Sequence, residues 1–476
     1  MNNQFSKFHL SQDIMDALDT LEYKIPTPIQ EKVIPIAQKG RDIVARSQTG
    51  SGKTAAFAIP ICEAAVWEYN EPQALVLEPT RELTVQVKEE IFHIGRNKRL
   101  KVPDLFGGFP IEKQILTLKQ KVHIVVGTPG RTMDHIRRET LNLSRIQTVV
   151  IDEADLMLDM GFIDDVKKII SAIGHPVKVY LFSATLREEL KELAQEYLKD
   201  PIYIDVEEST GALDIEQKTY FVRSEEKYDR FMDVLMKENP DSCMIFCDTR
   251  NMVDVLCRKL RKDGCKCVMI HGEIDQQDRM RTVEQFRRGR YRYLIATDVV
   301  ARGIDFENLS HVFNYDFPTG RETYVHRIGR TGRNGSSGVA LNFITEMDLK
   351  MKKMVEDYIG CELPYSDLIT VDENIKKTFF KRQKETPVLR TKKGAEFGKT
   401  ITKITIGGGK KSKMRTADIV GTICSIEGIM AKDIGVIDIR DSLTYVEILN
   451  QKGNEVLQAL QNKTIKGKLR KVRKTK

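Results

Sequence analysis

The sequence predicts two tandem α/β domains, each with a doubly wound parallel sheet, followed by a small α+β domain. Short apolar segments alternate with helical segments along two successive stretches, which is typical of parallel sheets with helices on both faces. Only the first stretch contains a glycine-rich loop followed by a lysine. At 476 residues the chain is also too long for a single hydrophobic core.

The first stretch runs from residue 42 to residue 185, and the second begins after a polar segment at residues 207–214. The expected strands of the first stretch are residues 42–45, 74–77, 123–126, 149–151 and 179–182. Those of the second are residues 244–246, 268–270, 293–296, 312–315 and 340–343. In such sheets the functional loops follow the carboxyl ends of the strands.

The C-terminal segment follows a βαββαβ order, which fits a small sheet of the RRM type. Its expected elements are a strand at 402–406, a helix at 417–426, strands at 436–439 and 445–448, a helix at 455–460 and a strand at 469–472. The resulting domain boundaries are 1–208, 215–365 and 401–476, with a basic and partly helical linker at 366–400.

Charge is distributed unevenly along the chain. Residues 401–476 hold 16 Lys/Arg against 7 Asp/Glu, a net charge of +9, while residues 1–400 hold 60 against 61, a net charge of −1. A basic domain beside a neutral core indicates a polyanionic partner, and a solubilising tail is the alternative. The eight cysteines lack zinc spacing and are expected as structural thiols without a disulfide partner. We expect no membrane segment and a cytoplasmic location.

A phosphate-binding loop is predicted between the first strand and the next helix. It comprises Ser47, Gln48, Thr49, Gly50, Ser51, Gly52, Lys53 and Thr54. The glycines let backbone N–H groups face an anion at a helix N-terminus. Lys53 is expected on the β- and γ-phosphates of ATP and Thr54 on Mg²⁺. Ser47 stands where the strict pattern has glycine.

Paired carboxylates follow the apolar strand at 148–151. Asp152 is expected to hold Mg²⁺, with Thr54, because Mg²⁺ prefers oxygen ligands and retains part of its water shell. Glu153 is expected to act as general base toward the attacking water. In the second domain, residues 326–333 bring together one histidine and three arginines. His326, Arg330 and Arg333 are candidates for the γ-phosphate, because arginine fingers accelerate its hydrolysis.

With these motifs in this order, the chain resembles a DEAD-box ATP-dependent RNA helicase over residues 5–345, which implies RecA-like domains. Tyr23 and Gln30 resemble the adenine-reading motif, with either Phe8 or Phe5 stacking on the base. Asp155, Ser183 and Thr185 resemble the residues that couple the state of ATP to domain closure. Asp305 resembles the residue that contacts a ribose.

The resemblance also implies RNA contacts from both α/β domains. In the first domain they are Pro79, Thr80, Arg81, Gly108, Thr128 and Arg131, and in the second they are Thr249, Arg250 and Thr297.

The C-terminal domain is similar to that of the bacterial DbpA group, which includes the Bacillus-type member YxiN. That group recognises a hairpin of 23S ribosomal RNA, and we expect this RNA, within a precursor of the large ribosomal subunit, as the partner. The expected sheet offers only Tyr445 for base stacking, so the basic edge should contribute most of the RNA contacts. That edge comprises Lys410, Lys411, Lys413 and Arg415.

The predicted function is ATP- and Mg²⁺-dependent unwinding or remodelling of short RNA duplexes by a monomer. One alternative is an ATP-gated RNA clamp that does not separate strands. Another is a DNA translocase with the same two-domain engine, which competition between RNA and single-stranded DNA would distinguish.

Overall fold

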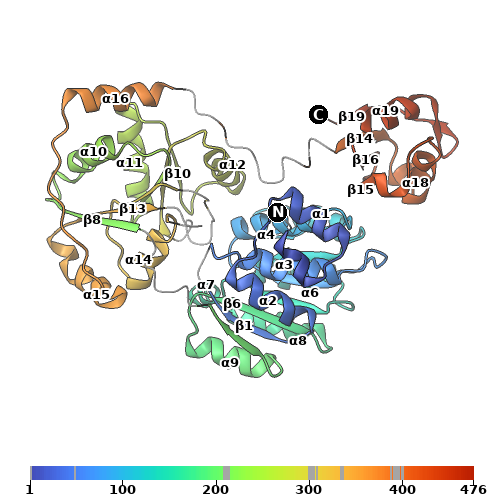
Figure 1. Ribbon diagram of the computed structural model, residues 1–476, viewed down its shortest axis with the longest axis horizontal. Helices are drawn as coiled ribbons and strands as arrows, with labels where there is room; N and C mark the ends of the chain where they lie inside the picture. The colour runs from blue at the N-terminus through green and yellow to red at the C-terminus, as the bar shows by residue number, and fades with distance from the viewer. Residues whose placement is uncertain are drawn as a thin grey trace. The chain divides into compact units, whose positions relative to one another are not determined.

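The computed structural model describes residues 3–47, 50–206, 215–298, 306, 309–332, 337–385, 389, 397 and 401–475. They form two units with parallel sheets and a C-terminal domain with an antiparallel sheet, which confirms the predicted fold class (Figure 1). No helix within these described ranges is long and apolar enough to cross a membrane.

The first sheet has seven parallel strands in the order β3-β4-β2-β5-β6-β1-β7. The strands are β1 (Ile43–Arg46), β2 (Ala74–Leu77), β3 (Asp104–Leu105), β4 (Ile124–Gly127), β5 (Thr148–Ile151), β6 (Lys178–Ser183) and β7 (Ile202–Asp205). The helices are η1 (Gln4–Phe8), α1 (Gln12–Thr20), α2 (Pro28–Gln38), α3 (Lys53–Ala64), α4 (Arg81–Ile94), α5 (Ile111–Leu118), α6 (Pro129–Arg137), α7 (Ala154–Asp159), α8 (Ile163–Ile173) and α9 (Glu188–Tyr197).

Alternate residues of these strands enter two separate hydrophobic cores, because successive side chains of a strand point to opposite faces. Ile43, Val76 and Val150 pack with α1, α2, α3 and α4, whereas Val44, Leu75 and Val149 pack with α6, α8 and α9. The sheet is therefore doubly wound and buried on both faces, which explains why its strands are continuously apolar.

The second sheet has six parallel strands in the order β10-β11-β9-β12-β13-β8. They are β8 (Ile215–Phe221), β9 (Cys243–Phe246), β10 (Cys267–Ile270), β11 (Tyr293–Ala296), β12 (His311–Asn314) and β13 (Gly338–Ile344). The helices are α10 (Lys227–Glu238), α11 (Arg250–Lys262), α12 (Gln276–Arg287), α14 (Arg321–Ile328), η2 (Glu346–Asp348), α15 (Leu349–Ile359) and α16 (Glu373–Lys384).

Helix α16 lies within the segment expected as a basic linker. Its Phe379 is fully buried and stacks on Tyr293 of β11, at 6.5 Å between ring centroids, and its Gln383 side chain donates a hydrogen bond of 2.6 Å to the Tyr293 hydroxyl. The part of 366–400 that forms this helix therefore belongs to the core of the second sheet, because one apolar face is covered while the lysines remain outside.

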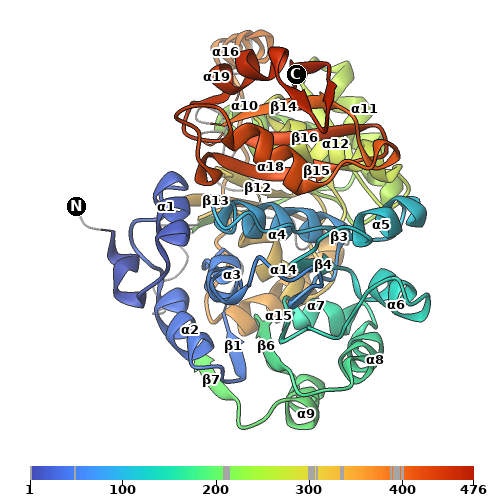
Figure 2. The ribbon, with the colours of Figure 1, turned by 90° about the vertical axis from the view of Figure 1, so that its right-hand side faces the viewer.

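The C-terminal domain has a four-stranded antiparallel sheet in the order β15-β16-β14-β19, with two helices (Figure 2). Its elements are β14 (Thr402–Gly407), η3 (Lys410–Ser412), α18 (Thr416–Cys424), η4 (Ala431–Asp433), β15 (Ile434–Ile439), β16 (Leu443–Ile448), α19 (Gly453–Asn462), β17 (Thr464–Ile465), β18 (Lys468–Leu469) and β19 (Val472–Lys474). The βαββαβ order agrees with the prediction.

The last expected strand, at 469–472, overlaps the observed strands only at its two ends. β17 and β18 form a small hairpin, and the strand that completes the sheet begins only at Val472. The apolar residues Leu469 and Val472 do not alternate with the residues between them, so pairing with β14, and not the local pattern, decides where this strand begins.

Candidate active site

Lys53 and two acids meet at the carboxyl ends of β1 and β5. Lys53 is the first residue of α3, and its Nζ lies 2.7 Å from Oε1 of Glu153 and 3.9 Å from Oδ1 of Asp152. All three side chains are buried. Asp152 follows β5, and its backbone N–H donates to Leu77 of β2 at 3.1 Å. The structure thus brings together residues that lie a hundred positions apart in the chain.

The glycine loop requires glycine for two separate reasons. Gly50 and Gly52 have φ angles of 87° and 90°, in the left-handed region that side chains disfavour. In addition, a Cβ on Gly52 would lie 2.6 Å from Nε2 of Gln30. Ser47, in place of the usual glycine, is buried after β1 and donates its N–H to the Ser183 carbonyl. Gln48 and Thr49 lie outside the described residues.

Gln30 connects the predicted adenine-reading motif to the glycine loop. Its Nε2 donates to the Gly52 carbonyl at 3.1 Å, and its Oε1 accepts from the Thr27 N–H at 2.9 Å. Phe5 and Phe8 are both buried, and Phe5 packs edge-on against Phe8 and Tyr23. The Tyr23 hydroxyl donates to Glu90 at 2.6 Å. These residues form one packed group, and the choice between Phe5 and Phe8 for adenine stays a prediction.

Burial raises the pKa of the Asp152 carboxyl group in this site to about 7, although Lys53 opposes the rise. Burial by itself would lower the pKa of Lys53, but attraction to Glu153 and Asp152 outweighs it and raises the pKa. The pocket therefore concentrates acidic groups around one buried cation.

Glu78 is a further acid that motif reasoning missed. It follows β2, is fully buried, and neither of its carboxyl oxygens has a hydrogen-bond partner among the described residues. Burial and the neighbouring Asp152 and Glu153 raise its pKa well above the ordinary value. The sequence contained a signal for this acid, because Glu78 directly follows the apolar strand β2, just as Asp152 directly follows β5.

The predicted coupling residues contact one another at the end of β6. The Asp155 Oδ2 accepts from the Thr185 N–H at 3.1 Å and from its hydroxyl at 3.2 Å. The Ser183 hydroxyl accepts from the Asp155 N–H at 3.2 Å and donates to the Thr185 carbonyl at 2.7 Å. Because β6 lies between β1 and β5 in the sheet, this group is positioned between the glycine loop and the acidic pair.

The RNA candidates of the first domain gather at the ends of β2, β3 and β4, which are neighbours in the sheet. Thr80 caps α4, with its hydroxyl accepting from the Leu83 N–H at 3.3 Å. A Cβ on Gly107 would lie 3.4 Å from the Arg81 guanidinium and 4.0 Å from that of Arg131. Pro79, Gly108 and Thr128 belong to the same three loops.

In the second domain, the candidates lie in the loops after β9 and β11, at the start of α11, on α14 and in the turn that follows α14. Thr249 caps α11 by accepting from the Met252 N–H at 3.1 Å, and Arg250 pairs with Glu273. Thr297 is buried after β11. The Arg330 Nε donates to the carbonyl of His326 at 3.1 Å. Asp305 and Arg333 lie outside the described residues.

The basic edge of the C-terminal domain is a tight turn after β14. A Cβ on Gly409 would lie 2.0 Å from the Arg440 carbonyl, so only glycine permits this approach. The N–H groups of Lys410 and Lys411 donate to the carbonyls of Arg440 and Asp441 at 2.8 and 2.9 Å. Lys410, Lys411, Lys413 and Arg415 are all exposed.

The fold and this site define an ATP-dependent enzyme with two parallel-sheet domains and a separate basic domain. Residues 27–193 match the family described as DEAD/DEAH box helicase. Residues 226–335 match the helicase conserved C-terminal domain, and residues 403–474 match the DbpA RNA binding domain.

Two curated relatives and two solved structures are similar to this chain. The ATP-dependent RNA helicase DbpA of Bacillus subtilis is 48% identical over 475 residues, which is 99% of each chain. The helicase CshA of the same organism is 40% identical over 78% of this chain and 76% of its own. Dbp5 of S. cerevisiae bound to RNA and ADP BeF3 gives a TM-score of 0.70 at 30% identity, over 80% of this chain and all of that one. Mss116 bound to single-stranded RNA and AMP-PNP gives a TM-score of 0.69 at 27% identity, over 80% of this chain and 81% of that one.

The chain belongs to the DEAD-box RNA helicases of the DbpA type. It is an ATP-dependent RNA helicase with an RNA-stimulated ATPase activity and an additional RNA-binding domain.

Proposed function

We propose that this helicase remodels short RNA duplexes near a hairpin of 23S ribosomal RNA during assembly of the large ribosomal subunit. In this proposal it acts as a monomer in the cytoplasm. The observation that carries the proposal is the C-terminal domain, which matches the DbpA RNA binding domain over residues 403–474 and presents four exposed cations on one turn. Helicase cores contact the sugar-phosphate backbone, which carries no sequence information, so a preference for one RNA needs such a domain.

The roles assigned to the nucleotide site are proposals that rest on its geometry. Lys53 binds the β- and γ-phosphates, the glycine loop surrounds them, and Glu153 accepts the proton of the attacking water. Gln30, with Tyr23 and one of Phe5 or Phe8, recognises adenine. His326, Arg330 and Arg333 act on the γ-phosphate, and Asp305 contacts a ribose.

The donor set around Lys53 fits Mg²⁺. Three buried carboxyl groups, on Glu78, Asp152 and Glu153, share one lysine, and Glu78 has no hydrogen-bond partner among the described residues. Hard oxygen ligands in excess of protein cations are what a magnesium ion bound to phosphates requires. Asp152 and Thr54 would hold the ion, which would neutralise the charge developing on the phosphates.

RNA contacts are assigned to the loops that follow β2, β3 and β4 in the first domain. Arg81 and Arg131 approach the same glycine, Gly107, from the first turns of two different helices, α4 and α6. Two guanidinium groups beside a bare backbone suit a phosphate, because the absent side chain leaves room for close approach. Thr249, Arg250 and Thr297 are assigned to the same strand through the second domain.

The proposal is tested by hairpin binding. We expect the full chain to bind the 23S hairpin more tightly than a scrambled control of equal length. A chain that ends at residue 400 should retain RNA-stimulated ATPase but lose the preference. Neutralising the basic turn, with Lys410, Lys411, Lys413 and Arg415 all changed to Gln, should reproduce most of that loss. The slope of log K against log salt should also become shallower by roughly 0.7 for each phosphate contact removed.

A charge-matched variant distinguishes the effect of the basic turn on RNA preference from the effect of the net charge of the protein. Lys39, Lys168, Lys191 and Lys199 are exposed lysines of the first domain, and changing all four to Gln removes the same charge elsewhere. This control should retain the preference for the hairpin. Equal discrimination by the full and shortened chains would place specificity in the core and contradict the proposal. ATP-dependent hairpin binding without strand release would favour the RNA clamp instead.

A further inference from the structure

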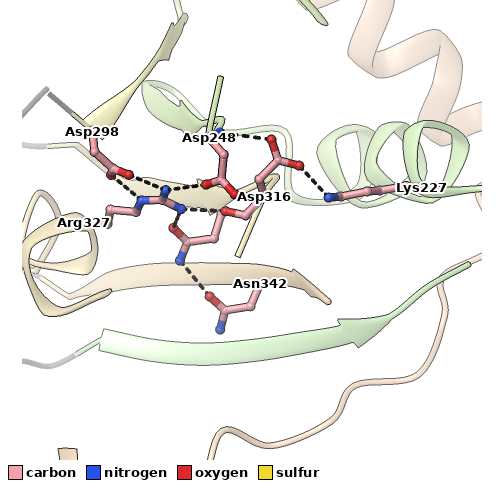
Figure 3. A network of polar contacts seen from close by, with 7 residues as sticks. Lys227, Asp248, Asp298, Asp316, Arg327 and Asn342 are labelled. Atoms are coloured by element: carbon pink, nitrogen blue, oxygen red, sulfur yellow. Dashed lines mark hydrogen bonds and ion pairs between the residues drawn. The ribbon is translucent and has the colours of Figure 1, made fainter. Parts of the chain in front are cut away.

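Arg327 is a fully buried arginine in α14 whose hydrogen bonds are all made inside the second domain (Figure 3). Its Nε and one terminal nitrogen donate to the two carboxylate oxygens of Asp298 at 2.5 and 2.7 Å. The same terminal nitrogen also donates to the Asp248 carboxylate at 3.1 Å. The other terminal nitrogen donates to the Asn314 side chain at 3.2 Å and to the Asp316 carbonyl at 2.6 Å.

These five hydrogen bonds use all five N–H donors of a guanidinium group. The plane of the group also lies over Phe246, with its carbon 5.0 Å from the ring centroid. Burial by itself would lower the pKa of Arg327, but Asp298 and Asp248 outweigh it and raise the pKa. Arg327 therefore remains charged and has no donor left for a phosphate, in contrast to the role assigned to Arg330.

The partners of Arg327 come from three adjacent strands. Asp248 follows β9, Asp298 follows β11, and Asn314 and Asp316 lie at and after the end of β12. In the sheet these strands are neighbours, in the order β11-β9-β12. One side chain from α14 thus holds the carboxyl ends of three strands at the edge where functional loops are found.

A second group of contacts reinforces the same loops. The Asp316 carboxylate accepts from the backbone N–H of Asp248 at 3.1 Å and pairs with Lys227 at 2.6 Å. The Asn314 side chain donates to Asn342 of β13 at 2.8 Å. Asn314 and Asp316 are thereby oriented by further hydrogen bonds. The other two acceptors, Asp248 and Asp298, follow the ends of β9 and β11.

The residues next to this network are those assigned to RNA and to ATP. Thr249 and Arg250 directly follow Asp248, and Thr297 directly precedes Asp298. His326 directly precedes Arg327, and the Nε of Arg330 donates to the His326 carbonyl. Two of the three loops that Arg327 holds, those after β9 and β11, therefore lie directly beside residues assigned to RNA, and Arg327 itself lies beside a residue assigned to the γ-phosphate.

We propose that Arg327 is a positioning residue that fixes the RNA-contacting loops after β9 and β11 to α14, which bears His326 and is followed directly by the turn that bears Arg330. RNA bound to those loops then stabilises the placement of α14 and of the residues His326 and Arg330, and this is how the second domain contributes to RNA-stimulated ATP hydrolysis. The inference rests on the residue roles given under Proposed function, and it adds the link between them. A guanidinium suits the task because its planar fork reaches several acceptors at fixed angles, which a lysine ammonium does not.

Arg327→Lys in the full chain is the principal test, because it retains the charge and removes the fork. We expect ATPase turnover at saturating RNA to fall about 10-fold or more, as the loss of buried charged hydrogen bonds implies. The affinity for a fluorescent ATP analogue, measured without RNA, should change less than about twofold, because Arg327 has no donor free for the nucleotide. Turnover equal to that of the parent would overturn the proposal.

Asp248→Ala keeps the test decisive if the lysine variant does not fold. The Asp248 side chain is 36% exposed and loses only one contact with Arg327, so the domain should tolerate the change. We expect the RNA concentration for half-maximal ATPase to rise several-fold, while turnover at saturating RNA stays near the parent value, because RNA itself then orders the loop. A parent-like RNA dependence in this variant would overturn the proposal.

Two control variants distinguish the proposed positioning role of Arg327 from a general structural role and from the assignment of Arg330 to the γ-phosphate. Arg288→Lys makes the same chemical change at an exposed arginine directly after α12 that pairs with Glu284, and its kinetics should match the parent. Arg330→Ala tests the γ-phosphate assignment alone. If Arg330→Ala loses turnover while Arg327→Lys does not, the positioning role is wrong and the assigned site stands. If Arg327→Lys only lowers the melting temperature, and its turnover is normal well below that temperature, the proposed link is also wrong.

Discussion

Lys53 in the first parallel-sheet domain and Arg327 in the second are both buried cations among carboxylates, and they differ in how many of their hydrogen-bond donors have protein partners. In the first domain Lys53 has one close partner, Glu153 at 2.7 Å, and a longer approach to Asp152 at 3.9 Å. In the second domain Arg327 uses every donor on protein acceptors. Both side chains are at most 5% exposed, so burial by itself does not separate their roles.

The difference shows how a cation can serve a ligand or a scaffold. A buried group with unused hydrogen-bonding capacity costs free energy until a ligand supplies the partner, whereas a saturated group stabilises the arrangement it already holds. Glu78 is a group of the first kind, because its carboxyl oxygens have no hydrogen-bond partner among the described residues. We therefore assign nucleotide chemistry to the first site and positioning to the second, and four variants test that division.

Lys53→Ala should have the largest effect. We expect ATP hydrolysis to fall to the level of buffer, because Lys53 lies 2.7 Å from Glu153 and 3.9 Å from Asp152 and is the cation within the sequence of the glycine loop. The buried acids should then take up protons rather than remain uncompensated. Hydrolysis with saturating RNA and the melting temperature are the measurements, and activity within about tenfold of the parent would contradict the assignment.

Arg330→Ala should reduce RNA-stimulated turnover by about 10³-fold, the lower range for an arginine finger. The affinity for ATP should change little, because the nucleotide is held by the glycine loop of the other domain. Steady-state kinetics and equilibrium binding of a fluorescent ATP analogue measure the two quantities. A loss of ATP affinity with normal turnover would instead place Arg330 in ground-state binding.

Glu153→Gln should reduce turnover by about 10² to 10³-fold, as expected for the loss of a general base. ATP and RNA should remain bound together, since the amide retains the shape of the side chain and Asp152 is unchanged. Trapping of labelled ATP with RNA on a filter is a direct measurement. Parent-like hydrolysis would show that another group accepts the proton.

Glu78→Gln should have the smallest effect, and it concerns stability. Because the pKa of Glu78 is raised in the folded state, its protonated form stabilises the protein below the ordinary value of 4.5, and that contribution is lost as pH rises. Without nucleotide and magnesium, the variant should therefore melt higher than the parent at about pH 8, by on the order of a few degrees. The difference should shrink toward about pH 5.

A surface glutamate provides the comparison for Glu78. Glu188 is 73% exposed at its side chain, and Glu188→Gln should change the melting temperature equally little at both pH values. If Glu78→Gln and Glu188→Gln behave alike, the carboxyl of Glu78 is not the group that penalises the folded state at high pH.

Much of the fold could be predicted from local pattern. Continuous apolar runs such as 149–151 are typical of strands buried on both faces, and the glycine loop before an alanine-rich helix follows from backbone sterics and helix-terminus electrostatics. Helix α16 was harder, because its lysines resemble a linker. Contacts with distant residues, such as Tyr293 of β11, show which face of α16 is buried.

The sequence by itself determined the order of strands and helices, the glycine loop, the acidic pair and the basic turn, because each depends on neighbouring residues and on backbone geometry. The tertiary structure decided which distant groups meet. The sheet order places the ends of β1, β5 and β6 side by side, and so joins Lys53 to Asp152 and Glu153. It also decided that every N–H donor of the Arg327 guanidinium has an acceptor, while the Glu78 carboxyl has no hydrogen-bond partner among the described residues, because hydrogen bonding in a buried site depends on groups contributed by several strands at once.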